Sequence, residues 1–455
     1  MTADNRQAGQ FTSLWAQLRA TAGRGPAPYV LTLAYATIVS ALLLLNPTTG
    51  LGTDMVVVLF LLLMFVIYRA PTMLAFKLTL GTILLGVIMP VFGVLNPFYI
   101  DVVTKAGMFA SLALGLNVVV GFAGLLDLGY VAFFAVGAYL WGIFSTPQIS
   151  NIVPGMVPLN GSWFWLFLAI GLAVGALFGV LLGLPVLRLR GDYLAIVTLG
   201  LGEVIRVLAT NLDRPVNITN GAQGIKDVGR PPLFVEPLFK ALGLNISVIQ
   251  EYQLYFYFLV LLILALTVLV VYRLNNSRIG RAWTAIREDE TAAIAMGVPL
   301  VRMKLLAFAV GASFAGTMGV IFSALQTFIN PPTFDLLRSI GILSMVILGG
   351  MGSIPGTMLG AVIVTLLDLQ LLPRIASELS ILQRRGVPIP SWFDPAQYQR
   401  LLFGLLLVIM MIFRPEGLLP EDRRRQELHQ DDLPAPAAEQ EQPAPAAEAK
   451  PEPGS

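Results

Sequence analysis

Residues 273–304 read RLNNSRIGRAWTAIREDETAAIAMGVPLVRMK, and this stretch determines how the rest of the chain can fold. It contains five arginines, a terminal lysine and the acidic triplet Glu288, Asp289 and Glu290, and long apolar runs flank it on both sides. An ionised side chain is strongly destabilised in hydrocarbon. The stretch is therefore predicted to be a water-exposed loop between two membrane spans, and its basic excess favours the cytoplasmic side.

The middle of this loop has a helical pattern. No proline or glycine occurs from Trp283 to Met296, and Gly297 and Pro299 follow as a stop signal. One apolar face of a short helix can form from residues at helical intervals, namely Trp283, Ile286, Ala293 and Met296. Two interpretations stay open: a solvated connector on the membrane surface, which the pattern alone favours, or a docking helix that fits a groove on a cytoplasmic partner.

The composition indicates an integral membrane protein. Of the 455 residues, 56% are hydrophobic and 12% are charged, against roughly 25% charged residues in soluble proteins. The chain has no cysteine, and its single histidine, His429, lies in a polar tail. No catalytic, metal or cofactor site is therefore predicted, and we expect a protein that is not an enzyme. The net charge of +2 is too small to indicate nucleic-acid binding.

Apolar runs predict an all-α polytopic membrane protein with about 10–12 transmembrane helices, some of them broken by glycine. The candidate runs are residues 29–45, 55–68, 78–94, 104–121, 128–145, 163–186, 191–210, 253–272, 305–327, 336–350, 356–372 and 400–413. If all of them span, most basic residues fall on the side of the 273–304 loop. That parity places both termini in the cytoplasm.

The chain divides into three parts by composition. Residues 1–28 form a polar segment that is predicted to be cytoplasmic, and residues 29–425 form the transmembrane domain. Residues 426–455 are rich in proline, alanine and glutamate, with too few large apolar residues to form a core. We expect this tail to be disordered.

Glycines interrupt the apolar runs at three places, and such breaks often line transport paths. The candidate path residues in two of them are Gly121, Gly124, Asp127, Gly349, Gly350 and Gly352, and the third break is Gly191-Asp192-Tyr193. Tight packing of helices through small residues is the alternative for any single glycine. VVVGFAG (118–124) also resembles VILGGMG (346–352), which indicates either a parallel internal duplication or a chance match.

Two ionisable residues lie inside the run 191–210. Glu203 and Arg206 are separated by three positions, so their side chains can face each other on a helix. Glu203 is a further candidate for the translocation path, because charges inside membrane spans are costly and usually functional. The alternative is a mutually neutralising pair that fixes helix packing or that lies near the outer interface of the membrane.

The sequence lacks the pattern G-x-x-x-x-G-K-[ST] that cradles nucleotide phosphates. If ATP drives transport, the subunit that hydrolyses it must be a separate chain. The charged loop would then have a cytoplasmic partner.

Several long motifs resemble the LivM-type permeases of branched-chain amino acid ABC importers. They are LGLNVVVGFAGLLDLGYVAFFAVGAYLWG (114–142), LRLRGDYLAIVTLGLGEVIR (187–206), TNGAQGI (219–225), SRIGRAWTAIREDETAAIAMGVPLVRMKLLAFAVGASFAGTMG (277–319) and MVILGGMGSIPGTMLGAVIV (345–364). The resemblance extends over about residues 98–420. The first 97 residues and the tail are not covered by it.

This resemblance implies a multi-pass subunit of the bacterial inner membrane with four kinds of partner. They are a sister permease of LivH type, two ATPases of LivG and LivF type, and an external substrate-binding protein. The resemblance also implies that Glu288, Asp289, Glu290, Thr291, Ala292 and Ala293 touch the ATPases, and we extend the coupling segment to Arg287, Met296 and Gly297.

Three functions are weighed. The favoured one is a permease subunit of an ATP-driven importer for branched-chain amino acids. A close relative is the urea ABC permease, so the cargo could instead be urea or a short amide. A stand-alone secondary transporter is the third, and the absence of an acid/histidine relay in the spans disfavours it.

Overall fold

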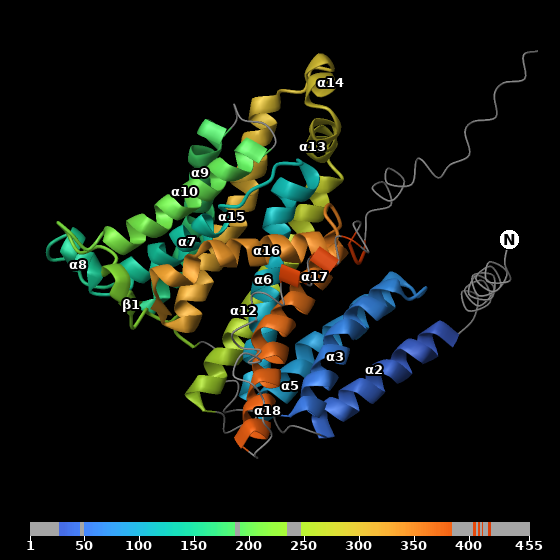
Figure 1. Ribbon diagram of the computed structural model, residues 1–455. Helices are drawn as coiled ribbons and strands as arrows, with labels where there is room; N and C mark the ends of the chain where they lie inside the picture. Colours follow the sequence, from blue (N-terminus) through green and yellow to red (C-terminus); the bar gives the residue numbers. More distant parts are fainter. Residues whose placement is uncertain are drawn as a thin grey trace, which may run out of the picture.

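The computed structural model describes residues 27–45, 50–186, 192–233 and 247–384, with short pieces at 404–405, 408–409, 412 and 417–419. The predicted N-terminal segment before residue 27, the tail 426–455 and most of the run 400–413 lie outside the described residues. In the described part the chain is an α-helical bundle, as the hydropathy pattern predicts (Figure 1).

Ten helices of the described part are long and apolar enough to cross a membrane, and a shorter apolar helix, α7, accompanies them. This confirms the prediction of an all-α polytopic membrane protein. The first half comprises α2 (Ala27–Leu45), α3 (Leu51–Arg69), α4 (Leu74–Ile83), η1 (Leu84–Ile88), α5 (Met89–Leu95), α6 (Pro97–Asn117), η2 (Val118–Phe122), α7 (Val131–Phe144), α8 (Gln148–Ile152), η3 (Gly161–Trp163), α9 (Phe164–Val186) and α10 (Asp192–Asn211).

The second half has the same helical character. It comprises η4 (Gly221–Gln223), β1 (Ile225–Lys226), α12 (Val248–Asn275), α13 (Arg278–Glu288), α14 (Glu290–Ala295), α15 (Leu300–Gln326), β2 (Phe328–Ile329), η5 (Pro331–Phe334), α16 (Leu336–Gly349), α17 (Ile354–Leu366), η6 (Leu367–Leu371) and α18 (Leu372–Arg384). Strands β1 and β2 pair antiparallel and tie two loops together at one end of the bundle.

Helices α6 and α15 form the centre of the bundle. In the most apolar part of each span, 89% of the residues are buried in the span that contains α6 and 72% in α15. Small residues let α15 approach its neighbours closely. Gly171, Gly175 and Gly179 of α9 recur every four residues and lie against the backbone of α15, and a Cβ at Gly179 would come within 2.6 Å of the Phe308 carbonyl oxygen. These glycines therefore serve tight helix packing, as expected for close crossings in membranes.

The first three spans, α2, α3 and α4–α5, pack beside the central bundle (Figure 1). A buried carboxylate joins them to it. Asp54 of α3 is 3% exposed and accepts hydrogen bonds from the Tyr99 hydroxyl at 2.7 Å, from Gln370 Nε2 at 2.8 Å and from Arg374 Nε at 3.0 Å. Because these partners belong to α6, η6 and α18, the N-terminal spans are held to the bundle by a polar network and not only by apolar contacts.

Candidate functional site: the charged loop and the glycine breaks

The charged loop folds into two short helices at one end of the bundle, at the top of Figure 1. The prediction of one helix from Trp283 to Met296 is therefore wrong. The chain breaks at Asp289, whose backbone is extended (φ −155°, ψ 111°). The Asp289 side chain then caps α14 by accepting from the backbone N–H groups of Thr291 at 2.7 Å and Ala292 at 3.1 Å. An aspartate at this position favours a helix start over a helix interior.

The apolar face of the loop packs against the protein's own membrane domain. Trp283, Ile286 and Ala293 are buried, and the Trp283 indole N–H donates to the Met303 carbonyl of α15 at 2.8 Å. Met296 does not belong to this face, contrary to the prediction, because it is 85% exposed. It follows the last residue of α14, and the left-handed turn at Gly297 (φ 83°) redirects the chain there.

Two charged side chains also fix the loop to the bundle. Arg287 donates from Nη1 to the Gly121 carbonyl at 2.7 Å, and Glu290 forms an ion pair with Lys304 of α15. The Lys304 side chain is 2% exposed. Since a buried ammonium is stable only beside an opposite charge, the Glu290 carboxylate anchors α14 on α15.

The remaining side of the loop is open. Six of the exposed residues between 288 and 296 form what we call the docking surface: Glu288, Asp289, Thr291, Ala292, Ile294 and Met296. Ile294 is 50% exposed and Met296 is 85% exposed, so two large apolar side chains stand among acids at the end of the molecule. Exposed apolar groups rimmed by polar ones are typical of protein interfaces.

The first and third glycine breaks lie against each other, although 228 positions separate Gly124 from Gly352 in the sequence. Asn117 Oδ1 accepts from the Gly352 N–H at 2.9 Å, and a Cβ at Gly121 would come within 2.6 Å of that same nitrogen. Gly124 has a left-handed backbone (φ 70°), and a Cβ there would lie 2.8 Å from Arg287 Cγ. The structure thus brings Arg287, Gly121, Gly124 and Gly352 together.

Gly349 and Gly350 lie at the end of α16. Gly349 packs against Gly356 at the start of α17, and Gly350 adopts a left-handed backbone with φ 119°. Both residues shape the sharp turn between α16 and α17. The second break is only partly described, because Gly191 lies outside the described residues.

Asp127 lies in the linker between η2 and α7 and is 1% exposed. Its Oδ1 accepts from the Gly129 N–H at 2.8 Å, and the neighbouring Leu128 N–H donates to Thr198 Oγ1 of α10 at 3.0 Å. Burial raises the pKa of the Asp127 carboxyl to about 6, and the hydrogen bond from the Gly129 N–H opposes that rise. This linker therefore connects the first glycine break to α10.

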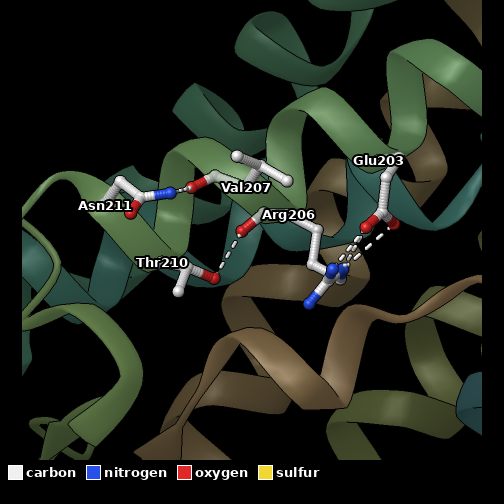
Figure 2. A network of polar contacts seen from close by, with 5 residues as sticks. All are labelled: Glu203, Arg206, Val207, Thr210 and Asn211. Atoms are coloured by element: carbon white, nitrogen blue, oxygen red, sulfur yellow. Dashed lines mark hydrogen bonds and ion pairs between the residues drawn. The ribbon is translucent and has the colours of Figure 1, made fainter.

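Figure 2 shows the pair predicted on α10. Arg206 Nε donates to both carboxylate oxygens of Glu203, at 2.8 and 3.0 Å, and its Nη2 contacts the same group. The side chains are 33% and 43% exposed for Arg206 and Glu203, and they stand near the middle of the span Tyr193–Asn211. Within the described residues, the side-chain hydrogen bonds of Glu203 all go to Arg206.

Sequence reasoning missed three features of this region. Asn117 bridges the glycine breaks, Lys304 anchors Glu290, and Arg287 caps the Gly121 carbonyl. Asn117 had a usable signal, because a polar amide stands directly before the glycine motif in an apolar run. The other two contacts join helices whose relative placement no sequence pattern gives.

A bundle of helices long enough to cross a membrane, in which a charged loop packs against a glycine break, has the architecture of a transport permease. The family model "Branched-chain amino acid transport system / permease component" matches residues 98–411. The chain therefore belongs to this permease family. Family membership and the apolar helices make it a multi-pass protein of the bacterial inner membrane.

Curated relatives agree with this assignment. The LivM permease proteins of high-affinity branched-chain amino acid transport in Salmonella typhimurium and Escherichia coli are each 37% identical over 341 residues, which cover 72% of this chain and 72% of each relative. The LivH permease protein of Salmonella typhimurium is 25% identical over 325 residues, 70% of this chain and 92% of that relative. No solved structure matches this chain.

Proposed function

We propose that this chain is a membrane subunit of an ATP-driven importer of branched-chain amino acids, assembled with a LivH-type sister permease, LivG- and LivF-type ATPases and an external substrate-binding protein. One observation carries the partnership with the ATPases: the charged loop packs with one side on α15 and the first glycine break and presents the docking surface on the other. A chain without its own nucleotide site needs such a surface to receive energy from another subunit.

The contacts of the loop suggest how movement would be transmitted. Trp283 and Glu290 bind α15, and Arg287 binds the first glycine break. A displacement of α13 and α14 by closing ATPases would therefore act on a central helix and on the break at once. Such coupling requires that the ATPases bind two positions of the loop with different affinity.

The path itself is proposed to run beside the glycine breaks and the Glu203–Arg206 pair. An ion pair whose side chains are 33% and 43% exposed at mid-span cannot face hydrocarbon without a large cost. A water-lined path or the sister permease must cover it. Because an amino acid carries one ammonium and one carboxylate, a wall with both charges also suits that cargo better than an apolar wall.

The path can be tested by thiol labelling, because the chain has no native cysteine. Val207, next to the pair and 43% exposed, is replaced by cysteine, and Leu181 of α9, which is 50% exposed, serves as the matched control. In the assembled importer we expect Val207→Cys to react with a charged, water-soluble thiol reagent at least about tenfold faster than Leu181→Cys, because thiolates form only in a polar environment. If both cysteines reacted equally slowly, the Glu203–Arg206 pair would not lie in the path.

Purification tests the proposed assembly. Tagged chain isolated from a membrane that contains the four partners should bring down the sister permease and both ATPases, and liposomes with the complex should take up leucine only with ATP and the binding protein. Uptake by the isolated chain under an ion gradient would instead support a stand-alone transporter. Uptake of urea with no uptake of leucine would contradict the proposed cargo.

A further inference from the structure

A second candidate binding site lies away from the charged loop, on the outer surface of the bundle. It is a groove between the beginning of α9 and the first half of α12, with ≈ 650 Å³ of empty space. Its lining consists of Trp165, Glu251, Leu254, Tyr255, Phe258, Leu259 and Leu262. All but one of these side chains are apolar or aromatic, so the exception needs an explanation.

That exception is Glu251, which is 7% exposed. Within the described part of the chain its side chain makes no ion pair or hydrogen bond. Arg230 stacks on the ring of Tyr252 at 4.9 Å and is not paired with Glu251. The first turn of α12 offers the carboxylate some partial positive charge, but no cation stands beside it among the described residues.

A second group in the groove also lacks a partner. The Tyr255 hydroxyl is buried and makes no hydrogen bond among the described residues. Its ring meets that of Trp165 edge to face at a centroid distance of 6.3 Å. Aromatic faces next to a carboxylate are a favourable environment for an ammonium group. The groove therefore offers a place for a cation beside Glu251 and the two rings.

The order of these groups along α12 matches the layers of a membrane. Glu251 lies in the first turn of α12, at the end remote from the charged loop. Tyr255, Phe258 and Leu262 follow on the same face over about 16 Å of helix. Phe258 is 42% exposed and Leu262 is 62% exposed, so the part of the groove nearer the middle of α12 opens to hydrocarbon. Along the groove an acidic residue is followed by aromatic and then by aliphatic residues. A phospholipid has the same order of polarity, from its head group through the glycerol to the acyl chains.

We propose that this groove binds a phospholipid whose head group carries a primary ammonium, as phosphatidylethanolamine does. The ammonium pairs with Glu251 and lies near the rings of Trp165 and Tyr255. An acyl chain lies along Phe258 and Leu262. The lipid supplies the missing cation beside Glu251 and covers the apolar lining.

Native mass spectrometry of the complete complex tests the charge complementarity. Phosphatidylethanolamine and phosphatidylglycerol with identical acyl chains are added in turn, and we expect the native chain to retain the former about tenfold better, as for a charge-assisted hydrogen bond. Glu251→Gln should abolish this preference. Asp213→Asn, the same change at an exposed acid outside the groove, should keep it. Equal retention of both lipids, or an unchanged preference in Glu251→Gln, would overturn the proposal.

Fluorescence provides a second test that does not depend on the Glu251 variant. The complex is placed in liposomes that contain one of the two lipids with brominated acyl chains, which quench tryptophan fluorescence. The quenching of Trp165 is obtained by subtracting the quenching measured in Trp165→Phe from that measured in the native chain. Brominated phosphatidylethanolamine should quench Trp165 more strongly than brominated phosphatidylglycerol at equal content. Equal quenching by the two lipids would show that the groove holds bulk lipid without selection.

Discussion

Replacing Ile294 and Met296 together with glutamate should uncouple ATP hydrolysis from transport. Both side chains are exposed, at 50% and 85%, at the end of the molecule where the charged loop folds. Large apolar residues surrounded by polar ones carry most of the binding energy of an interface, and losing such anchors costs at least about 2 kcal/mol. We therefore expect leucine uptake and substrate-stimulated ATP hydrolysis in liposomes to fall at least about 30-fold.

The design includes a matched control. Val157, 76% exposed in a loop outside the charged loop, is changed to glutamate, and this variant should transport normally. Glu288→Lys is a useful companion, because Glu288 is exposed and its replacement disturbs no described contact. Full coupling in the Ile294→Glu, Met296→Glu variant, with all subunits assembled, would show that the ATPases bind elsewhere.

Replacing Glu290 with glutamine should destabilise the membrane domain itself. Lys304 is 2% exposed and its ammonium pairs with the Glu290 carboxylate, so the variant leaves a buried charge without its partner. Breaking a buried ion pair in this way costs on the order of 3 kcal/mol. The unfolding midpoint of the purified chain in denaturant should fall accordingly. Glu290 is therefore unsuitable for charge-reversal tests of docking, because its effect on folding would be mistaken for an effect on coupling.

A second substitution separates the two roles. Lys304→Met in the Glu290→Gln background removes the unpaired charge, and we expect most of the lost stability to return, since the largest penalty of a broken ion pair is the buried charge left without a partner. Asp101→Asn breaks the more exposed pair Lys105–Asp101, with side chains 23% and 30% exposed, and should cost less than about 1 kcal/mol. If Glu290→Gln lowered the free energy of unfolding no more than Asp101→Asn does, the anchoring role of Glu290 would be refuted.

Much of the architecture follows from local properties of the sequence. Apolar runs long enough to span, the charged stretch 273–304 and the missing nucleotide motif predict a helical permease that works with other subunits, and the family match bears this out. The Glu203–Arg206 pair was also predictable, because a spacing of three residues on one helix fixes the distance between two side chains.

Other predictions failed where a single residue interrupts a helix. Asp289 ends α13 and caps α14, so the predicted single helix is two, and Met296 points outward. The hydropathy pattern does not predict that Asp54 is buried, because the apolar run begins after it, at residue 55. The network of Asp54 with Tyr99, Gln370 and Arg374 exists only once three distant spans pack together.

The sequence by itself determined that the chain forms apolar helices long enough to cross a membrane, and that the charged stretch 273–304 lies between two of them. Those properties are sums over neighbouring residues, since the cost of burying each side chain in hydrocarbon depends mainly on that residue. Only the tertiary structure decided that Arg287 reaches Gly121, that Asn117 holds Gly352 and that Glu251 faces an apolar groove. Such contacts depend on how helices rotate and cross, which close packing of small residues sets between segments far apart in the chain.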